Sequence, residues 1–126
     1  MNFSKDYIEL CKNDKVQELR EFLSEGDYCV DIDSEHWFEE LITHVEWKRI
    51  EGRIWLPTGD QLDQCIVDIC KKHKWFYKVT FYASMTTCEI FPPEQEYEIA
   101  IHSQDSFNNP LICKLKLLLS LLESEE

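Results

Sequence analysis

The carboxylates of Asp31-Ile32-Asp33-Ser34-Glu35 stand at alternate positions, as the oxygen ligands of a calcium-binding loop do. Such a loop also needs a glycine at its sixth position and a glutamate at its twelfth, and these positions hold His36 and Ile42. The chain has no Cys-x-x-Cys pair, and its cysteines and histidines lack the spacing of zinc ligands. We therefore expect no metal site.

Side chains that could act as nucleophiles or bases are scattered along the chain. The segment Ser84–Cys88 has hydroxyls and a thiol, but it lacks the G-x-S-x-G elbow and a base that a third group orients. His36 and His44 lie eight positions apart with no further group at a useful spacing. Three glycines are too few for a glycine-rich phosphate loop. We expect no catalytic residue, no cofactor and no enzymatic activity.

The strongest chemical signal is a run of acidic residues in a chain whose formal net charge is −12. Between Glu21 and Glu46 there are nine acids and no lysine or arginine. Such a surface repels phosphate, so we expect no direct binding to nucleic acid. It attracts a basic protein surface instead, including one that normally holds nucleic acid.

The residues expected to bind a protein partner lie within this run and include one aromatic anchor. Trp37 is chosen because tryptophan is favoured at the centre of protein interfaces. The alternative interpretation is a solvated acidic face that keeps a small protein soluble. The expected partner-binding residues are Asp27, Asp31, Asp33, Glu35, Trp37, Glu39, Glu40 and Glu46.

The composition fits a folded protein of 126 residues, because 44% of the residues are hydrophobic and only 3 Gly and 4 Pro are present. No apolar run approaches the roughly 20 residues that span a bilayer, and Met1–Asn13 lacks the apolar region of a signal peptide. We expect a cytoplasmic protein with no membrane contact. The six cysteines fall mostly among apolar positions and are expected to be reduced, buried thiols.

The clearest predicted element is a helix after Ile54-Trp55-Leu56-Pro57. Pro57 ends an extended run, and Thr58 with Gln61 forms a capping box for the helix. An apolar face recurs at helical spacing, and residues 71–74 close the helix with positive charge. The apolar positions of this face are Leu62, Cys65, Ile66, Ile69 and Cys70.

Before that helix the pattern is weaker. Residues 4–23 are predicted to be helical with a break at Asn13-Asp14, and Tyr28–Ile32 to be a short strand. Asp33-Ser34 then caps a predicted helix over 35–44, and 45–56 are predicted to be extended with a turn at Glu51-Gly52.

After the helix, residues 75–83 and 87–91 predict an antiparallel hairpin, with Trp75, Tyr77, Val79, Phe81 and Ala83 on one face of the first strand. Residues 97–102 predict a third strand. Asn109 caps a last helix with Pro110 at its first position. The predicted buried stripe of that helix is Leu111, Ile112, Leu115, Leu118, Leu119 and Leu122.

These elements predict a single α+β domain over 1–126, in which a small antiparallel sheet of about three or four strands packs with helices. Its parts are an N-terminal helical segment, 1–26, an acidic segment, 27–56, and a helix-strand-strand-strand-helix core, 57–122.

Three features resemble small, mostly uncharacterised proteins encoded by phages and prophages of Gram-positive bacteria. One is the helix entry Trp55-Leu56-Pro57-Thr58 with Asp60-Gln61-Leu62, and another is the opening Asp6-Tyr7-Ile8 with Cys11 and the later Glu25-Gly26-Asp27-Tyr28. The third is the aromatic hairpin followed by Pro110-Leu111-Ile112-Cys113, which is similar to the phage ABA sandwich domain. The resemblance implies phage origin and a small helix-plus-sheet fold, and it supplies no catalytic residue.

Together these observations predict a phage-encoded acidic protein that binds and inhibits a host defence or nucleic-acid-handling complex, as anti-CRISPR proteins do, in the cytoplasm of the bacterial host. The expected partner is a host protein with a basic surface. One alternative is a phage structural or assembly accessory, with the apolar C-terminal helix supporting a homo-oligomer. Another is a protein that sequesters a small ligand such as a nucleotide signal, in a concave site lined by the aromatic hairpin.

Overall fold

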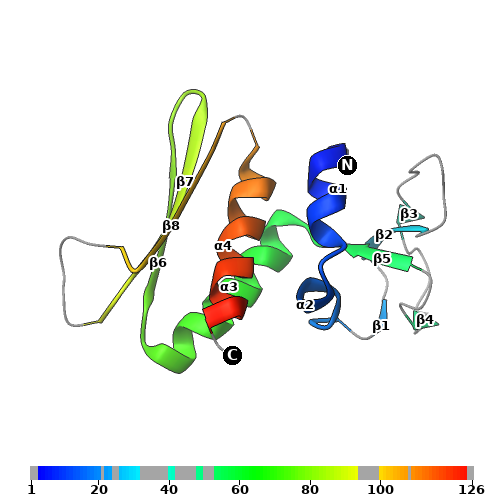
Figure 1. Ribbon diagram of the computed structural model, residues 1–126, viewed down its shortest axis with the longest axis horizontal. Coiled ribbons are helices and arrows are strands. Elements are labelled where there is room, and N and C mark those ends of the chain that lie inside the picture. Colours follow the sequence, from blue (N-terminus) through cyan, green and yellow to red (C-terminus); the bar gives the residue numbers. More distant parts are fainter. Residues whose placement is uncertain are drawn as a thin grey trace. The chain divides into compact units, whose positions relative to one another are not determined.

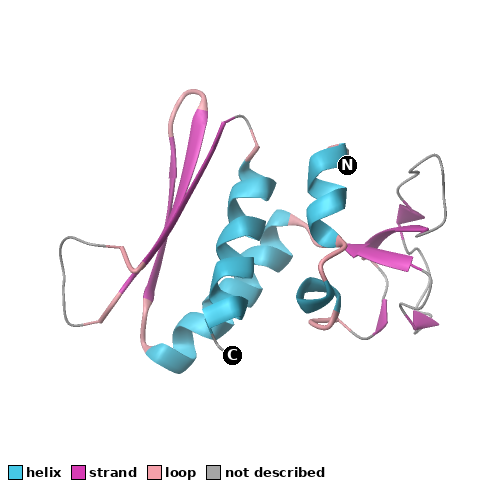
Figure 2. Cartoon of the chain, in the orientation of Figure 1, coloured by secondary structure: helices cyan, strands magenta, loops and turns pink. Residues whose placement is uncertain are grey.

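The computed structural model describes residues 3–20, 22–23, 26–31, 40–41, 48–49, 53–93, 100–107 and 109–124. The chain divides into two compact units, Met1–Thr58 and Gly59–Glu126. The described residues form helices and antiparallel sheets, which confirms the predicted α+β class (Figures 1 and 2). The prediction of a single domain stays a prediction, and each unit is described by itself below.

The first unit combines two short helices with short strands. Its two helices start at polar caps, because Ser4 Oγ accepts from the Tyr7 N–H at 3.2 Å and Asn13 Oδ1 accepts from the Lys15 N–H at 2.9 Å. Its strands pair in the orders β3-β2-β5 and β1-β4. The elements are α1 (Lys5–Cys11), α2 (Asp14–Gln17), β1 (Phe22–Leu23), β2 (Tyr28–Asp31), β3 (Glu40–Leu41), β4 (Lys48–Arg49) and β5 (Arg53–Leu56).

Two predictions for this unit are wrong. The expected helical segment over 4–23 does break near Asn13, but its second helix ends at Gln17, and Phe22–Leu23 is a strand paired with Lys48–Arg49. The helix expected over 35–44 is wrong at Glu40–Leu41, which form a strand paired with β2. In both places a few apolar residues fit either period, and pairing with a distant strand decided the outcome.

Trp55 lies at the centre of the first unit, with 2% of its surface exposed. The Gln17 side chain makes the two backbone hydrogen bonds that a neighbouring strand would make. Gln17 Oε1 accepts from the Trp55 N–H at 2.8 Å, and Gln17 Nε2 donates to the Trp55 carbonyl at 3.1 Å. The Tyr7 hydroxyl donates to the Pro57 carbonyl at 2.5 Å. The Trp55–Pro57 part of the sequence motif therefore joins β5 to both helices of this unit.

The second unit is a three-stranded antiparallel sheet with two helices. The strand order is β6-β7-β8, and α4 packs on the sheet beside α3 (Figure 1). The predicted central helix and hairpin are confirmed. The elements are α3 (Gly59–His73), β6 (Phe76–Phe81), β7 (Met85–Phe91), β8 (His102–Phe107) and α4 (Pro110–Ser124).

Helix α4 begins as predicted, because Asn109 Oδ1 accepts from the Ile112 N–H at 3.2 Å and Pro110 is the first helical residue. The predicted buried stripe is wrong in part. Nine of its fifteen residues are Leu, Ile or Cys, so the tertiary contacts rather than the sequence period select the buried face. The buried residues are Cys113, Leu115, Leu117, Leu118 and Leu121.

The third strand of the sheet lies later than predicted. The sequence favoured the apolar alternation of residues 97–102, whereas strand β8 is the polar run His102–Phe107. Residues 94–99 lie outside the described residues, so the expected strand is tested only from Ala100 onward. As an edge strand, β8 takes its place through its backbone ladder with β7 from Ile90↔His102 to Met85↔Phe107.

All six cysteines are free thiols, and five of them are buried. The Cys113 thiol on α4 lies 3.3 Å from Cys88 Sγ on β7 and donates to the Gln104 carbonyl on β8 at 3.1 Å. These thiols pack as small apolar side chains between the last helix and the sheet.

Candidate functional site

Most of the expected acidic partner-binding surface lies outside the described residues. Strands β2 and β3 place the backbones of Asp31 and Glu40 in one sheet, where Asp31 pairs with Arg53 of β5 and Glu40 pairs with Cys29 of β2. Asp27 is described in full and is only 2% exposed. The expected partner-binding residues outside the described part are Asp33, Glu35, Trp37, Glu39 and Glu46.

The Asp27 carboxylate is buried in the first unit and forms an ion pair there. Asp27 Oδ2 lies 3.3 Å from Arg20 Nη1, and the Arg20 guanidinium stands 5.2 Å from the centre of the Trp55 ring. This arrangement is a buried acid paired with an arginine that also makes a cation–π contact. A carboxylate used in this way is not available to a protein partner, so Asp27 is left out of the surface proposed below.

The described thiols and phenols with perturbed acidity are all shifted toward the neutral form. Burial raises the pKa of Cys11 and of Cys88 to about 12, and it also raises the pKa of Tyr7 and of Tyr77. A nucleophilic cysteine needs the opposite shift, toward the thiolate. These groups therefore behave as core residues.

A polar network links three elements of the second unit. The Tyr77 hydroxyl on β6 donates to Asp63 Oδ1 on α3 at 2.8 Å, and Lys114 Nζ on α4 donates to Asp63 Oδ2 at 2.9 Å. Lys114 is the more sheltered ion, with 12% of its side chain exposed against 35% for Asp63. One carboxylate thus fixes the positions of α3, α4 and β6 relative to one another.

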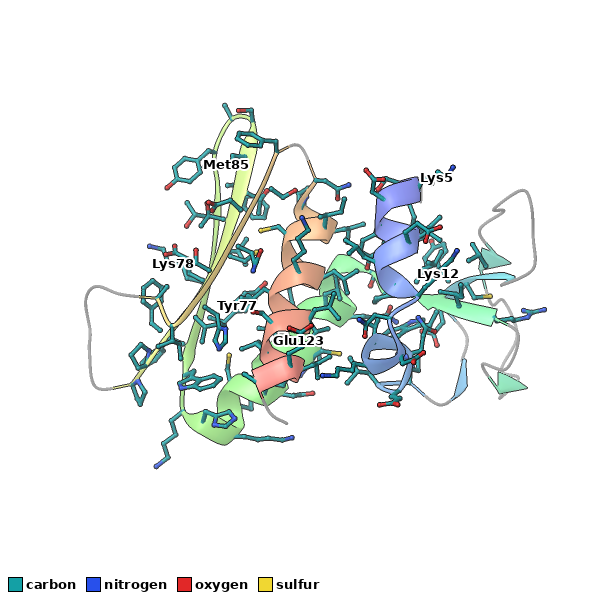
Figure 3. All side chains as sticks on the ribbon, in the orientation of Figure 1. Lys5, Lys12, Tyr77, Lys78, Met85 and Glu123 are labelled. Carbon is teal, nitrogen blue, oxygen red and sulfur yellow. The ribbon has the colours of Figure 1, made fainter. Side chains whose placement is uncertain are left out.

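The sheet of the second unit has one face on the helices and one face turned away from them. On β7 the buried residues Thr86, Cys88 and Ile90 alternate with less buried ones, and Cys113 of α4 contacts Thr86 and Cys88. Figure 3 agrees with this alternation, since Tyr77 lies on the side of the sheet that faces α4 and Lys78 lies on the other side. We call the side that carries Lys78 the outer face.

The strand register arranges the outer face in four rows across β6, β7 and β8. Both end rows are apolar, and the two middle rows are polar, with Lys78 directly opposite Glu89. The hydrogen bonds Ile101 N–H to Ile90 carbonyl and Tyr82 N–H to Met85 carbonyl extend the register to the end rows. From one end to the other the rows are Phe76-Phe91-Ile101, Lys78-Glu89-Ser103, Thr80-Thr87-Asp105 and Tyr82-Met85-Phe107.

The end rows of the outer face expose large apolar side chains. Phe107 is 73% exposed, Phe76 63%, Tyr82 60% and Ile101 43%. Phe81 is equally exposed at 65%, but its register partner is the buried Thr86, so it belongs to the opposite face. Large apolar side chains that share one surface mark interaction sites more often than single exposed ones do.

A cavity of about 460 Å³ opens where α3 passes into β6. Its lining combines the last turns of α3 with the start of the strand, and it holds three aromatic side chains and two lysines. The lining residues are Val67, Cys70, Lys71, Lys74, Trp75, Phe76 and Tyr77.

Comparison with protein-family models, with curated protein sequences and with solved structures finds no match to this chain. Within the described residues, no helix is both long enough and apolar enough to cross a membrane. The same residues hold no group of three or more His, Cys, Asp or Glu side chains placed to bind a metal ion. The resemblance to phage proteins accordingly stays a hypothesis drawn from the sequence.

The sequence predicted a concave site at the aromatic hairpin only as an alternative, and it identified neither the residues of the outer face nor the full lining of the cavity. The alternation of Phe76, Lys78 and Tyr82 with Tyr77 and Val79 was visible, but both sets contain aromatic residues. Neither set could be assigned to the core until the packing of α4 was known. The cluster Lys71–Lys74 was interpreted only as charge at a helix end, because its neighbours in the cavity come from the following strand.

Proposed function

We propose that this chain is a non-catalytic binding protein that docks on a protein with a basic surface. The observation that supports this most strongly is the outer face of β6-β7-β8, which exposes aromatic side chains in both end rows. Tyr82 and Phe107 lie together in one row, 60% and 73% exposed, and supply rigid anchors of the kind that dominate interface energies.

The charges of the outer face favour a basic partner. Lys78 stands opposite Glu89 and is offset by it, whereas Asp105 is exposed and stands opposite Thr87. The chain as a whole carries a formal net charge of −12. Such a charge speeds the approach of a basic partner, and desolvated aromatic contacts then slow its release.

A non-catalytic function is supported by the state of the described reactive groups. Cys11 and Cys88 are fully buried, with the pKa of each raised to about 12, so their thiols stay protonated at neutral pH. Tyr77 is engaged by Asp63, and Asp63 by Lys114. These polar groups join helices and strands to one another. This supports a role in which the surface of the protein binds a partner.

The resemblance to phage proteins of Gram-positive bacteria suggests where the protein acts and on which kind of target. In this proposal the protein acts in the cytoplasm of the host and inhibits a defence or nucleic-acid-handling complex by covering lysine and arginine side chains that hold phosphates. The acidic residues from Asp31 to Glu46 supply carboxylates for this, and the outer face supplies apolar contact area.

Affinity capture from a nuclease-treated lysate of a Gram-positive bacterium, followed by binding measurements with the recovered partner, tests the proposal. We expect Tyr82→Ser with Phe107→Ser to weaken binding by about tenfold or more, since an aromatic anchor at an interface commonly contributes about 2 kcal/mol. Phe81→Ser is the matched control, because it removes an equally exposed aromatic residue from the opposite face. Equal losses in both variants would contradict docking at the outer face.

Charge-reversal variants distinguish a direct contact made by the acidic segment from an effect of the net charge alone. Changing Asp31, Asp33, Glu39 and Glu40 to lysine adds two positive charges per site and moves the formal net charge from −12 to −4. The matched set Asp6, Glu9, Asp14 and Glu18, all exposed, makes the same change on α1, α2 and the α2 C-cap. If the acidic segment contacts the partner, only the first set abolishes binding; equal effects would mean that net charge acts without a site.

A further inference from the structure

The cavity at the end of α3 has aromatic walls that other residues hold in place. The Trp75 N–H donates to the Cys70 carbonyl at 2.9 Å, and the Trp75 ring stacks on His73 with 4.1 Å between centroids. The centroid of the His102 ring lies 6.0 Å from that of Trp75, with the two rings tilted. Tyr77 is fixed by its hydrogen bond to Asp63. A planar ligand therefore meets walls that need little ordering on binding.

The same cavity carries positive charge in an otherwise acidic chain. Residues 67–77 contain three lysines and one aspartate, a local balance of +2, against −12 for the whole chain. Distant acids act weakly there, because charges more than about 10 Å apart are largely screened at ordinary ionic strength. The ion pairs formed among the described residues involve neither Lys71 nor Lys74, and both are exposed at the cavity.

Lys74 occupies a backbone position that lysine rarely takes. Its φ is +59°, directly after the end of α3, where glycine is the usual residue. The bond from the Trp75 N–H to the Cys70 carbonyl completes a Schellman turn around it. Complementing the helix dipole does not require this choice, because the dipole amounts to about half a charge and Lys71 and Lys72 already lie in the last turn.

We propose that this cavity binds a nucleoside monophosphate, with the base against Trp75 and Phe76 and the phosphate between Lys71 and Lys74. Its volume of about 460 Å³ lies within the range of sites that enclose small ligands. Aromatic walls accept any base by stacking, and lysines bind phosphate as point charges. The proposal does not rest on protein docking at the outer face, although Phe76 belongs to both surfaces.

Calorimetric titration of the purified full chain with adenosine, guanosine, cytidine and uridine monophosphates at low salt tests the proposal. Adenosine and inorganic phosphate, each titrated alone, separate the contributions of the ring and the charge. We expect at least one monophosphate to bind at least tenfold more tightly than either part alone, because ring and phosphate are held at once. Phosphate binding as tightly as the monophosphates would overturn the proposal, as would no binding by any of the four.

Variants at the cations locate the site. Lys71→Ala with Lys74→Gly is expected to weaken monophosphate binding by about tenfold or more, as loss of hydrogen bonds to a charged group commonly does. Lys72→Ala is the matched control, since it removes a neighbouring charge that does not line the cavity, and its affinity should stay within about twofold. Lys74→Gly suits the backbone at φ +59°, so lost binding would not reflect lost folding. Wild-type affinity in the double variant would overturn the assignment.

Discussion

Phe76 on β6 stands directly opposite Phe91 on β7, on the face of the sheet turned away from α4. The two side chains share an end row with Ile101, and Phe76 keeps 63% of its surface exposed. A sheet that buries one face on helices and exposes aromatic rows on the other carries the kind of apolar surface that often marks an interaction site. This relationship is the basis for assigning protein binding to the outer face.

Gln17→Ala is expected to destabilise the first unit. The Gln17 side-chain amide forms hydrogen bonds with both the N–H and the carbonyl of Trp55, and it also donates to the Cys11 carbonyl at 2.6 Å. Loss of these bonds leaves sheltered backbone groups unpaired, so we expect a cost of about 2–3 kcal/mol in the free energy of unfolding. Urea denaturation followed by tryptophan fluorescence measures it. Gln64→Ala removes an exposed amide bonded to Asp68 and should change stability by less than about 0.5 kcal/mol.

Lys74→Gly is expected to stabilise the second unit. The left-handed conformation costs a non-glycine residue about 1–2 kcal/mol, and glycine loses about 0.5–1 kcal/mol of chain entropy, so the net gain is about 0.5–1 kcal/mol. Thermal unfolding at neutral pH provides the measurement. Lys72→Gly, inside the last turn of α3, should instead destabilise by about that amount. A lower melting temperature for Lys74→Gly would contradict the described backbone.

The Tyr77–Asp63–Lys114 network is expected to act as a unit. Tyr77→Phe removes the hydroxyl that donates to Asp63, and Lys114→Met removes the cation on its other oxygen. Each single change should cost about 1 kcal/mol or more, and a double-mutant cycle should give a coupling energy of at least about 0.5 kcal/mol. Additive losses would mean that the two partners stabilise Asp63 independently.

Stability is expected to fall in alkaline solution. Burial raises the pKa of Cys11 and of Cys88 from 9.0 to about 12, so between these values the unfolded chain releases protons that the folded chain keeps. Their contribution is complete below pH 9.0 and is lost as the pH rises through about 12. Urea midpoints at about pH 8 and about pH 10.5 measure the loss, and Cys88→Ala should show a smaller drop. An unchanged midpoint would contradict burial of these thiols.

The elements that sequence predicts well are those whose signals are local. Helix α3 follows Pro57 and carries an apolar face at helical spacing, and α4 starts at the Asn109 cap. Strand β8 shows the opposite case, because His102–Phe107 is a polar run that becomes a strand only by pairing with β7. Strands of two residues, such as Phe22–Leu23, likewise depend on a distant partner.

The candidate sites depend on tertiary structure for the same reason. Asp27 belongs by sequence to the acidic run, yet Arg20 and burial remove it from the surface. Tyr82 and Phe81 are neighbours of equal exposure, and only the register with β7 assigns them to different faces. The left-handed conformation of Lys74 and the cavity beside it follow from the turn at the end of α3. A lysine at this position of the sequence does not predict such a turn.

The most direct test of protein docking at the outer face is hydroxyl-radical footprinting of the chain, free and bound to its captured partner. Oxidation reports solvent exposure of each aromatic side chain without any substitution. We predict that Phe107 and Tyr82, now 73% and 60% exposed, are strongly protected in the complex, while Phe81, 65% exposed on the opposite face, keeps its oxidation rate. Unchanged oxidation of Phe107 and Tyr82 in the complex would contradict the proposed docking surface.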